Sequence, residues 1–268
     1  MNTNGDGKRS TNHEAYWDSP ESIAEYSAAP FLLRGERLAL AACFEGGFAG
    51  RPVLDLACGA GRTTYFLQQM GAEVIAVDIA ENLIRAARRN FPGIDFRVGD
   101  AEFLEFADNS FDAVLFSYNS LDCLYPKEKR LNSLREVWRV LRPNGSFVFS
   151  HHNLGALFCG WYRFLRPAKL HYRLTHILNG NAFRPECYLP ELGLPEMNMY
   201  FAWPRQVIAD LMHSGFVTLH IFPNDAILWF LQRSLGTNRL TRLAEPWPYY
   251  VCRKLAASTA KSGQSLAG

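Results

Sequence analysis

The segment VLDLACGAGRTT, residues 53 to 64, carries the pattern of residues that is most informative about chemistry. A hydrophobic strand pattern runs into a turn that contains Gly59 and Gly61, and a helical pattern follows at once. Glycines at such a turn let bare backbone approach a ligand at the N-terminus of the helix. Asp78 ends the next predicted strand, 17 residues after Gly61, where an acidic side chain can accept hydrogen bonds from ribose hydroxyls. The pattern predicts a site for an adenosine-containing ligand.

The same loop lacks the features of a phosphate-binding site. A dinucleotide site has a third glycine three residues after the second, so that the helix N-terminus faces a pyrophosphate. This chain has Thr64 at that position, and no Lys-Ser/Thr pair of a P-loop follows. The predicted ligand therefore carries no phosphates at this point.

With these residues, the chain resembles the class I S-adenosylmethionine-dependent methyltransferases from about Arg51 to Arg253. DLACGAG matches the first motif of that family, with Ala57 in place of the commoner glycine. GDAEFL (99 to 104) matches the segment that contacts adenine, FDAVLFSYNSLDCL the fourth motif, and LREVWRVLRPNGSFVFS the fifth. The fourth motif lacks the Asn/Asp-Pro-Pro-Tyr of many enzymes that methylate bases or glutamine, which argues against those substrates.

The resemblance implies S-adenosyl-L-methionine as the cofactor and assigns its contacts residue by residue. It places four residues of the first motif along the methionine and ribose, Asp78 at the ribose diol and Asp100 at the adenine amino group. The residues that it implies in cofactor binding are Asp55, Ala57, Gly59, Gly61, Asp78, Asp100, Ala101 and Ser117.

The elements that must position these residues alternate between strands and helices. Short β-branched runs at 52–57, 73–79, 94–100, 111–117 and 146–152 alternate with helical patterns, and two further strands are expected at 216–222 and 249–255. Short links between such elements favour a parallel sheet covered on both faces. We therefore predict an α/β fold with a doubly wound, Rossmann-like, mostly parallel seven-stranded sheet and an aromatic-rich insertion after strand five.

The domain organisation follows from composition. Residues 1–14 and 255–268 are expected to be flexible tails around a single methyltransferase domain, residues 15–254, with cap segments at 153–203 and 223–246. The rings crowded into the first cap segment favour an apolar or ring-bearing substrate. Arg163, Arg166 and Lys169 lie beside LGALFCGWYRFL, a pattern compatible with peripheral membrane contact. Tyr16, Trp17 and Tyr26, before the first strand, are candidates for a lid that excludes water, and ordinary packing of an amphipathic helix is the alternative.

Methyl transfer to a hydroxyl requires a base, and the candidates follow strands four and five. His151 is the preferred base because histidine titrates near neutrality, and His152 is the alternative. Neighbours on a strand point to opposite faces, so only one of them should reach the pocket. Asp122 is a further catalytic candidate. Each also has a structural explanation: a hydrogen-bonded histidine, or an N-cap or solvent-facing charge in the case of Asp122.

Composition narrows the function classes. The chain has 268 residues and a formal charge of +2, so it lacks the excess of positive charge that is typical of nucleic-acid-binding proteins. Its six cysteines are scattered, so a reducing cytoplasm is expected, and no transmembrane segment or metal site is predicted. The expected function is O- or N-methylation of a small organic acceptor. The alternatives are a methyltransferase acting on RNA or protein, a cofactor-binding subunit without turnover, and a nicotinamide dehydrogenase; no oligomeric state is predicted.

Overall fold

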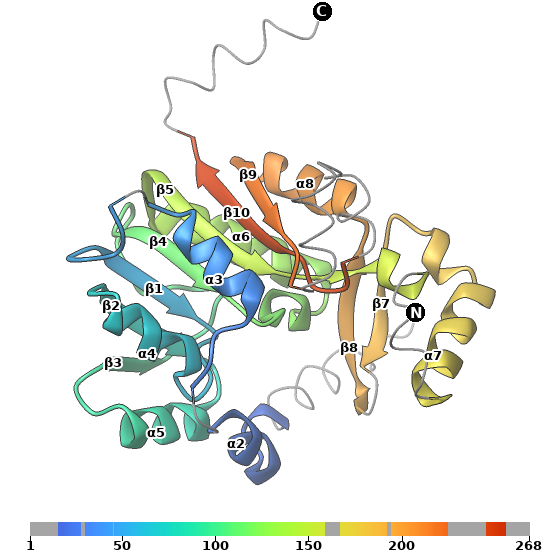
Figure 1. The fold of residues 1–268 in the computed structure, drawn as a ribbon, viewed down its shortest axis with the longest axis horizontal. Helices are drawn as coiled ribbons and strands as arrows, with labels where there is room; N and C mark the ends of the chain where they lie inside the picture. The colour runs from blue at the N-terminus through green and yellow to red at the C-terminus, as the bar shows by residue number, and fades with distance from the viewer. Residues whose placement is uncertain are drawn as a thin grey trace, which may run out of the picture.

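A computed structural model describes residues 16–27, 30–44, 46–158, 167–191, 194–224 and 245–255. A seven-stranded sheet forms its centre, in the order β3-β2-β1-β4-β5-β10-β9 (Figure 1). Every strand expected from the sequence is present. Their bounds are β1 Pro52–Leu56, β2 Glu73–Asp78, β3 Asp95–Val98, β4 Phe111–Phe116, β5 Leu141–Ser150, β9 Phe216–Phe222 and β10 Tyr249–Lys254.

The sheet is mostly parallel, as predicted. The pairs β1/β2, β1/β4, β2/β3 and β4/β5 are parallel, whereas β10 runs antiparallel to both β5 and β9. The central strands are buried on both faces, because consecutive residues of β1 such as Val53 and Leu54 are both fully buried. Their continuous apolar runs are what a sheet covered on both sides requires.

Helices cover both faces of the sheet. Leu40 of α3 and Leu67 of α4 pack with Val53, whereas Val137 of α6 and Leu211 of α8 pack in a separate cluster with Leu54. Side chains of neighbouring strand residues point to opposite faces, so these clusters lie on the two sides of the sheet. The helices are α2 Pro20–Tyr26, α3 Arg34–Ala41, α4 Arg62–Gln69, α5 Glu81–Asn90, α6 Lys127–Val140, α7 Pro167–Leu178 and α8 Pro204–His213.

The insertion after strand five builds a small layer of its own. Strands β6 (His152–Asn153), β7 (Glu186–Glu191) and β8 (Leu194–Ala202) form a second sheet in the order β6-β8-β7. The short 3-10 helices η2 (Leu154–Leu157) and η4 (Asn181–Phe183) and helix α7 lie against it, at the edge of the molecule away from β3 (Figure 1). We call this unit the cap.

Some predicted segments lie outside the described residues. They include the N-terminal tail 1–14, residues 256–268 of the C-terminal tail, and residues 159–166 and 225–244 of the two cap segments. No helix in the described part of the chain is long and apolar enough to cross a membrane.

Candidate active site

The glycine loop between β1 and α4 adopts left-handed backbone conformations. Gly59 has a φ of 55° and Gly61 a φ of 89°, values that favour glycine. A Cβ on Gly61 would lie 2.9 Å from the rings of Phe91 and Phe96, so this glycine serves packing. A Cβ on Gly59 would meet no protein atom within 4 Å. The space over Gly59 is therefore open to a ligand.

Asp78, at the end of β2, holds this loop in place. Its carboxylate accepts hydrogen bonds from the backbone N–H of Gly59 and of Ala80, each at 2.8 Å. Burial raises the pKa of Asp78, and the backbone hydrogen bonds oppose that rise. The side chain also lines the cavity in front of the loop, where its carboxylate can accept from ribose hydroxyls.

Asp55 has a different place from the one that the family motif implies. It is almost fully buried, and a single carboxylate oxygen, Oδ2, accepts from the hydroxyls of Thr63 and Thr64 at 2.8 and 2.6 Å. Among the described residues that line the cavity, neither Asp55 nor Gly61 appears. Burial raises the pKa of Asp55 to about 6. Asp55 therefore lies outside the cavity lining and stabilises the first turn of α4 through these two hydrogen bonds.

A cavity of about 510 Å³ opens at the carboxyl ends of the parallel strands. This is the position at which open α/β sheets bind ligands. Six of the eight residues expected to contact the cofactor line it, and the helical turn after β3 adds Glu102. The six are Ala57, Gly59, Asp78, Asp100, Ala101 and Ser117.

A buried ionic network beneath this cavity was missed by the sequence analysis. Glu36 of α3 is fully buried and pairs with both terminal nitrogens of Arg62 at 2.7 and 2.5 Å. Ser117 and Tyr249 donate their hydroxyls to Oε1 of the same carboxylate. Arg62 and Ser117 both line the cavity. The network therefore joins α3, the glycine loop, the end of β4 and the last strand.

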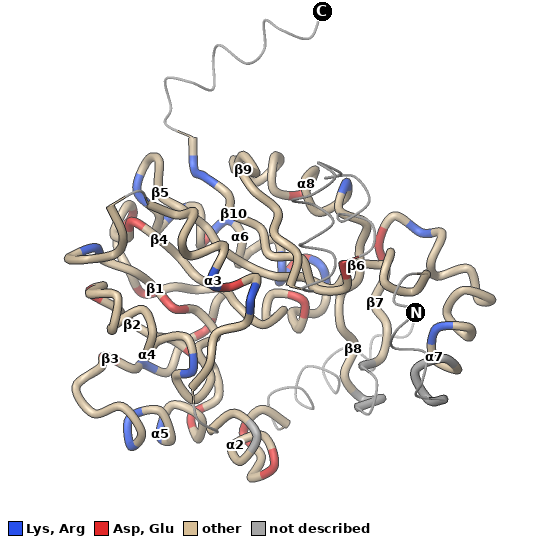
Figure 2. The backbone as a smooth tube through the Cα atoms, viewed as in Figure 1, with Lys and Arg blue, Asp and Glu red and all other residues tan. Residues whose placement is uncertain are grey.

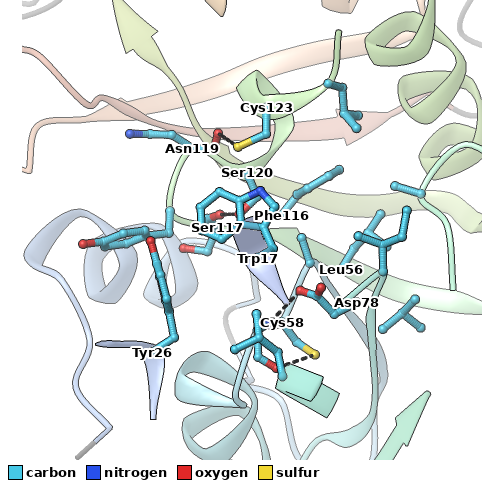
Figure 3. Close-up of a pocket in the computed structure, with 18 of the residues that line it drawn as sticks. Trp17, Tyr26, Leu56, Cys58, Asp78, Phe116, Ser117, Asn119, Ser120 and Cys123 are labelled. Carbon is cyan, nitrogen blue, oxygen red and sulfur yellow. Dashed lines mark hydrogen bonds between the residues drawn. The ribbon is translucent and has the colours of Figure 1, made fainter. Parts of the chain in front are cut away.

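Aromatic side chains of the N-terminal segment cover the cavity, and Trp17 and Tyr26 pack against Ala60 and Leu83 beside the glycine loop. Tyr16, Trp17 and Tyr26 line the cavity from the N-terminal segment, and Trp17 and Tyr26 project toward the loops that carry Cys58 and Ser117 (Figure 3). The rings of Trp17 and Tyr26 meet edge to face, with their centroids 5.6 Å apart. The cap contributes further lining residues, which are Met197, Met199 and His152, and Trp247 joins them from the segment before β10.

The two histidines after β5 have different surroundings. His152 lines the cavity, whereas His151 is 1% exposed and is not among the described lining residues. Neither ring nitrogen of His151 has a hydrogen-bond partner in the structure, and burial lowers its pKa well below the usual range, so this ring is neutral. As expected from strand geometry, one of the two reaches the cavity. It is His152, and not the residue preferred from the sequence.

Asp122 is the partner of His152. The carboxylate is fully buried in η1 (Ser120–Cys123), so it is not a solvent-facing charge. Its Oδ2 accepts from the backbone N–H of His152 at 2.6 Å and lies 3.0 Å from the ring Nδ1. Because Nδ1 faces a carboxylate, it carries the ring proton, and Nε2 keeps a lone pair. Burial raises the pKa of Asp122, and the hydrogen bonds from His152 lower it.

The loop after β4 is strained where it meets this pair. Tyr118 and Asn119 have φ values of 56° and 59°, a left-handed conformation that side chains other than glycine seldom adopt. The side-chain nitrogen of Asn119 lies 3.3 Å from Nε2 of His152, and its backbone N–H donates to Ser150 at 2.8 Å. The strained loop thus places Asn119 beside the lone pair of His152, at the cavity wall.

The doubly wound sheet, the glycine loop and the acid at the end of β2 define a nucleoside-binding methyltransferase fold. A family model for a methyltransferase domain matches residues 53–145. A demethylmenaquinone methyltransferase of Renibacterium salmoninarum is 35% identical over 192 residues, which is 65% of this chain and 75% of the relative. Another from Clavibacter sepedonicus is 38% identical over 185 residues, 64% of this chain and 73% of the relative.

Among solved structures, the CcbJ methyltransferase from Streptomyces caelestis has the same fold, with a TM-score of 0.61 and 16% identity over 91% of this chain and 99% of its own. The chain belongs to the class I S-adenosylmethionine-dependent methyltransferases. It is an enzyme, and its methyl donor is S-adenosylmethionine. The residues fit this cofactor, since the space over Gly59 is open and Asp78 faces it.

Proposed function

We propose that the protein methylates a hydroxyl group of a small, ring-bearing molecule and that His152 is the general base. One observation carries the proposal. His152, whose Nδ1 contacts the buried Asp122, lines the same cavity as Gly59 and Asp78. A base that shares a cavity with a methyl-donor site is what methylation of a hydroxyl requires.

The chain's own residues account for the proton. S-adenosylmethionine, when bound, supplies a methyl group that is already activated on a sulfonium. Asp122 keeps the proton of His152 on Nδ1, so Nε2 accepts the proton that the acceptor hydroxyl loses, and the carboxylate then stabilises the imidazolium. Asn119, beside Nε2, can hold the acceptor oxygen. Trp17 and Tyr26 exclude water from the cavity.

The chemistry of the cavity wall supports a ring-bearing acceptor. The part around His152 is lined by the rings of Tyr118 and Trp247 and by the thioethers of Met197 and Met199. Flat aromatic surfaces and flexible methionines suit an apolar ring. Small-molecule methylation also agrees with the relatives, which are named demethylmenaquinone methyltransferases.

Those names favour a second candidate, in which the methyl group goes to a ring carbon. The same base would serve it, because deprotonating a hydroxyl of a reduced quinone raises the electron density of the neighbouring ring carbon. That carbon takes the methyl group and then loses its own proton, which re-forms the hydroxyl, so the net proton released is the one held by His152. The two candidates differ in the product. Incubation with 1,4-naphthohydroquinone and carbon-13-labelled S-adenosylmethionine, followed by NMR, separates a methoxy carbon from a ring methyl carbon.

The base is tested by comparing His152→Gln with His151→Gln. We expect His152→Gln to lower kcat by about 10²- to 10⁴-fold and to remove the rise of kcat with pH, while affinity for S-adenosylhomocysteine stays the same. His151→Gln should keep both the activity and the pH profile. Equal activity of His152→Gln and wild type would refute the base. An absence of turnover of any phenol or hydroquinone by a chain that binds S-adenosylhomocysteine would support a non-catalytic subunit instead.

A further inference from the structure

Helix α7 of the cap presents apolar side chains outward. Tyr172, His176 and Ile177 face inward and are buried or half-buried. The opposite stripe, at the spacing i, i+3 and i+7, consists of His171, Leu174 and Leu178, and the two leucines are 49% and 83% exposed. A helix that faces water on this side would carry polar residues there. The outward leucines indicate that something covers them.

Two phenylalanines extend this apolar stripe. Phe183 of η4 is 72% exposed, and its ring meets that of Phe158 with the centroids 5.8 Å apart. Helix α7 contacts both η4 and η2, the elements beside which these rings lie. We call Phe158, Leu174, Leu178 and Phe183 together the outer cap face. Its four side chains come from α7 and from the short elements that α7 contacts, so they belong to one layer of the cap.

The sequence around this face is strongly basic. Residues 151–185 contain no Asp or Glu, and they contain Arg163, Arg166, Lys169, Arg173 and Arg184. The whole chain has a net charge of only +2, so the rest of it is slightly negative. Figure 2 shows the described part of α7 without any acidic residue. Apolar side chains within an acid-free basic segment complement a surface that is apolar below and anionic above.

We propose that the outer cap face docks on the surface of an anionic lipid bilayer. Leucine and phenylalanine side chains would enter the boundary between headgroups and acyl chains, and the exposed Arg184, next to Phe183, would contact the phosphates. This inference rests on the proposed function. If the protein methylates a ring-bearing acceptor, docking on a bilayer implies that the acceptor is attached to a lipid.

The cap connects the docking face to the active site. Ile177 of α7 packs in the same apolar cluster as Met197 and Met199 of β8, and these two methionines line the cavity. Tyr16 and Trp17 of the N-terminal segment pack against this cluster as well. The outer cap face and one wall of the cavity are thus two sides of one thin layer. A protein docked through α7 would hold its acceptor site next to the membrane surface.

Flotation with vesicles tests the proposal on the full chain. We expect the wild type to float with vesicles of equal parts phosphatidylglycerol and phosphatidylcholine, and at least about tenfold less with phosphatidylcholine alone. Leu174→Gln with Leu178→Gln should lower the partition coefficient by about tenfold or more, since two apolar side chains no longer enter the membrane. Arg184→Gln should lower it by about fivefold.

Met212→Gln is the matched control, because Met212 is 65% exposed near the end of α8 and does not belong to the outer cap face, so flotation should stay unchanged. The double leucine variant should methylate a water-soluble hydroquinone as fast as wild type. Flotation needs no turnover, so the docking and the proposed function can fail separately. The docking is overturned if the wild type does not float, if it floats equally with both vesicle types, or if the double variant floats like wild type. It is also overturned if light scattering shows a dimer that the double variant separates, because the face would then join two copies.

Discussion

The cofactor end and the acceptor end of the cavity are built in different ways. The cofactor end comes mainly from consecutive turns after β1, β2 and β3, where backbone conformation and a few acids make the site. The acceptor end is assembled from the loop after β4, the cap and the segment before β10, and the N-terminal segment packs against both ends. The geometry of the cofactor end therefore depends mainly on local sequence. The geometry of the acceptor end depends on how segments that are distant in the sequence pack together.

Each end contains a carboxyl group that is essentially fully buried, and the two groups have different partners. Asp55 accepts from two threonine hydroxyls, whereas Asp122 accepts from His152, which faces the cavity. Burial raises the pKa of both. We infer that the first carboxyl group is structural and the second acts on the reaction. Substitutions at the two ends should therefore separate cofactor affinity from turnover.

The largest effect is expected at the cofactor end. Gly59→Asp places a charged side chain in the space that the cofactor needs, so affinity for S-adenosylhomocysteine should fall by more than about a hundredfold. Calorimetry measures this. Gly93→Asp is the control, because Gly93 also has a positive φ and open space around it but does not line the cavity. Unchanged affinity in Gly59→Asp would contradict the location of the cofactor.

At the acceptor end, Asp122→Asn should keep cofactor affinity and lose turnover. An amide at this position no longer stabilises the imidazolium of His152, so kcat should fall by about 10²- to 10³-fold. Steady-state kinetics at saturating S-adenosylmethionine measure the loss. If affinity for S-adenosylhomocysteine fell and kcat did not, the division between the two ends would be wrong.

Asp55→Asn sharpens the comparison through pH. The folded state holds the Asp55 proton up to about pH 6, above the ordinary value of 3.8, so it binds more protons than the unfolded state between these values. This contribution to stability is complete below the unfolded pKa and is lost as pH rises through the folded pKa. The free energy of unfolding of the wild type should therefore fall relative to Asp55→Asn by about 2 kcal/mol between about pH 4 and pH 7.

Urea denaturation at several pH values measures this difference. Asparagine can keep both threonine hydrogen bonds, because both hydroxyls donate to one oxygen of Asp55. A difference between the two proteins that stays constant with pH would show that Asp55 has an ordinary pKa.

The smallest effect is expected for Asp78→Ala. The variant loses the carboxylate that faces the ribose position, and affinity for S-adenosylhomocysteine should weaken by about 1 to 3 kcal/mol. Two backbone N–H groups, of Gly59 and Ala80, also lose their acceptor, so thermal unfolding of the free protein should be measured in parallel. Affinity equal to that of wild type would remove Asp78 from the cofactor site.

The sequence predicted the fold, and six of the eight residues expected to contact the cofactor line the cavity, for a physical reason. A strand, a tight turn and a helix follow one another within residues 53 to 64, so the geometry of the loop depends on local sequence. The alternation of strands and helices also predicted the seven strands of the large sheet and their mostly parallel arrangement, whereas their order across the sheet comes from the structure. Asp55 was expected to contact the cofactor but does not line the cavity, because a sequence motif does not tell on which side of the loop a side chain lies.

The acceptor end could be predicted only in part. Strand alternation limited the base to one of two histidines, but the choice depends on how the chain leaves β5 at Ser150 and enters the cap at His152. Glu36 has no signal at all in the segment RGERLALA, where a single acid resembles a solvated charge. It is buried because Arg62, Ser117 and Tyr249 surround it from three other elements. Such partners become visible only in the folded chain.

The position of Tyr249 in the Glu36 network has a consequence for biosynthesis. Glu36 emerges early from the ribosome, whereas the tyrosine that hydrogen-bonds to it belongs to the strand that is translated last among the described elements. A nascent chain that has already folded its first βα units still lacks this support under the nucleoside pocket. We expect the growing polypeptide to gain affinity for its methyl donor only once that strand has been translated, so an enzyme truncated before it would not compete for the cell's donor supply.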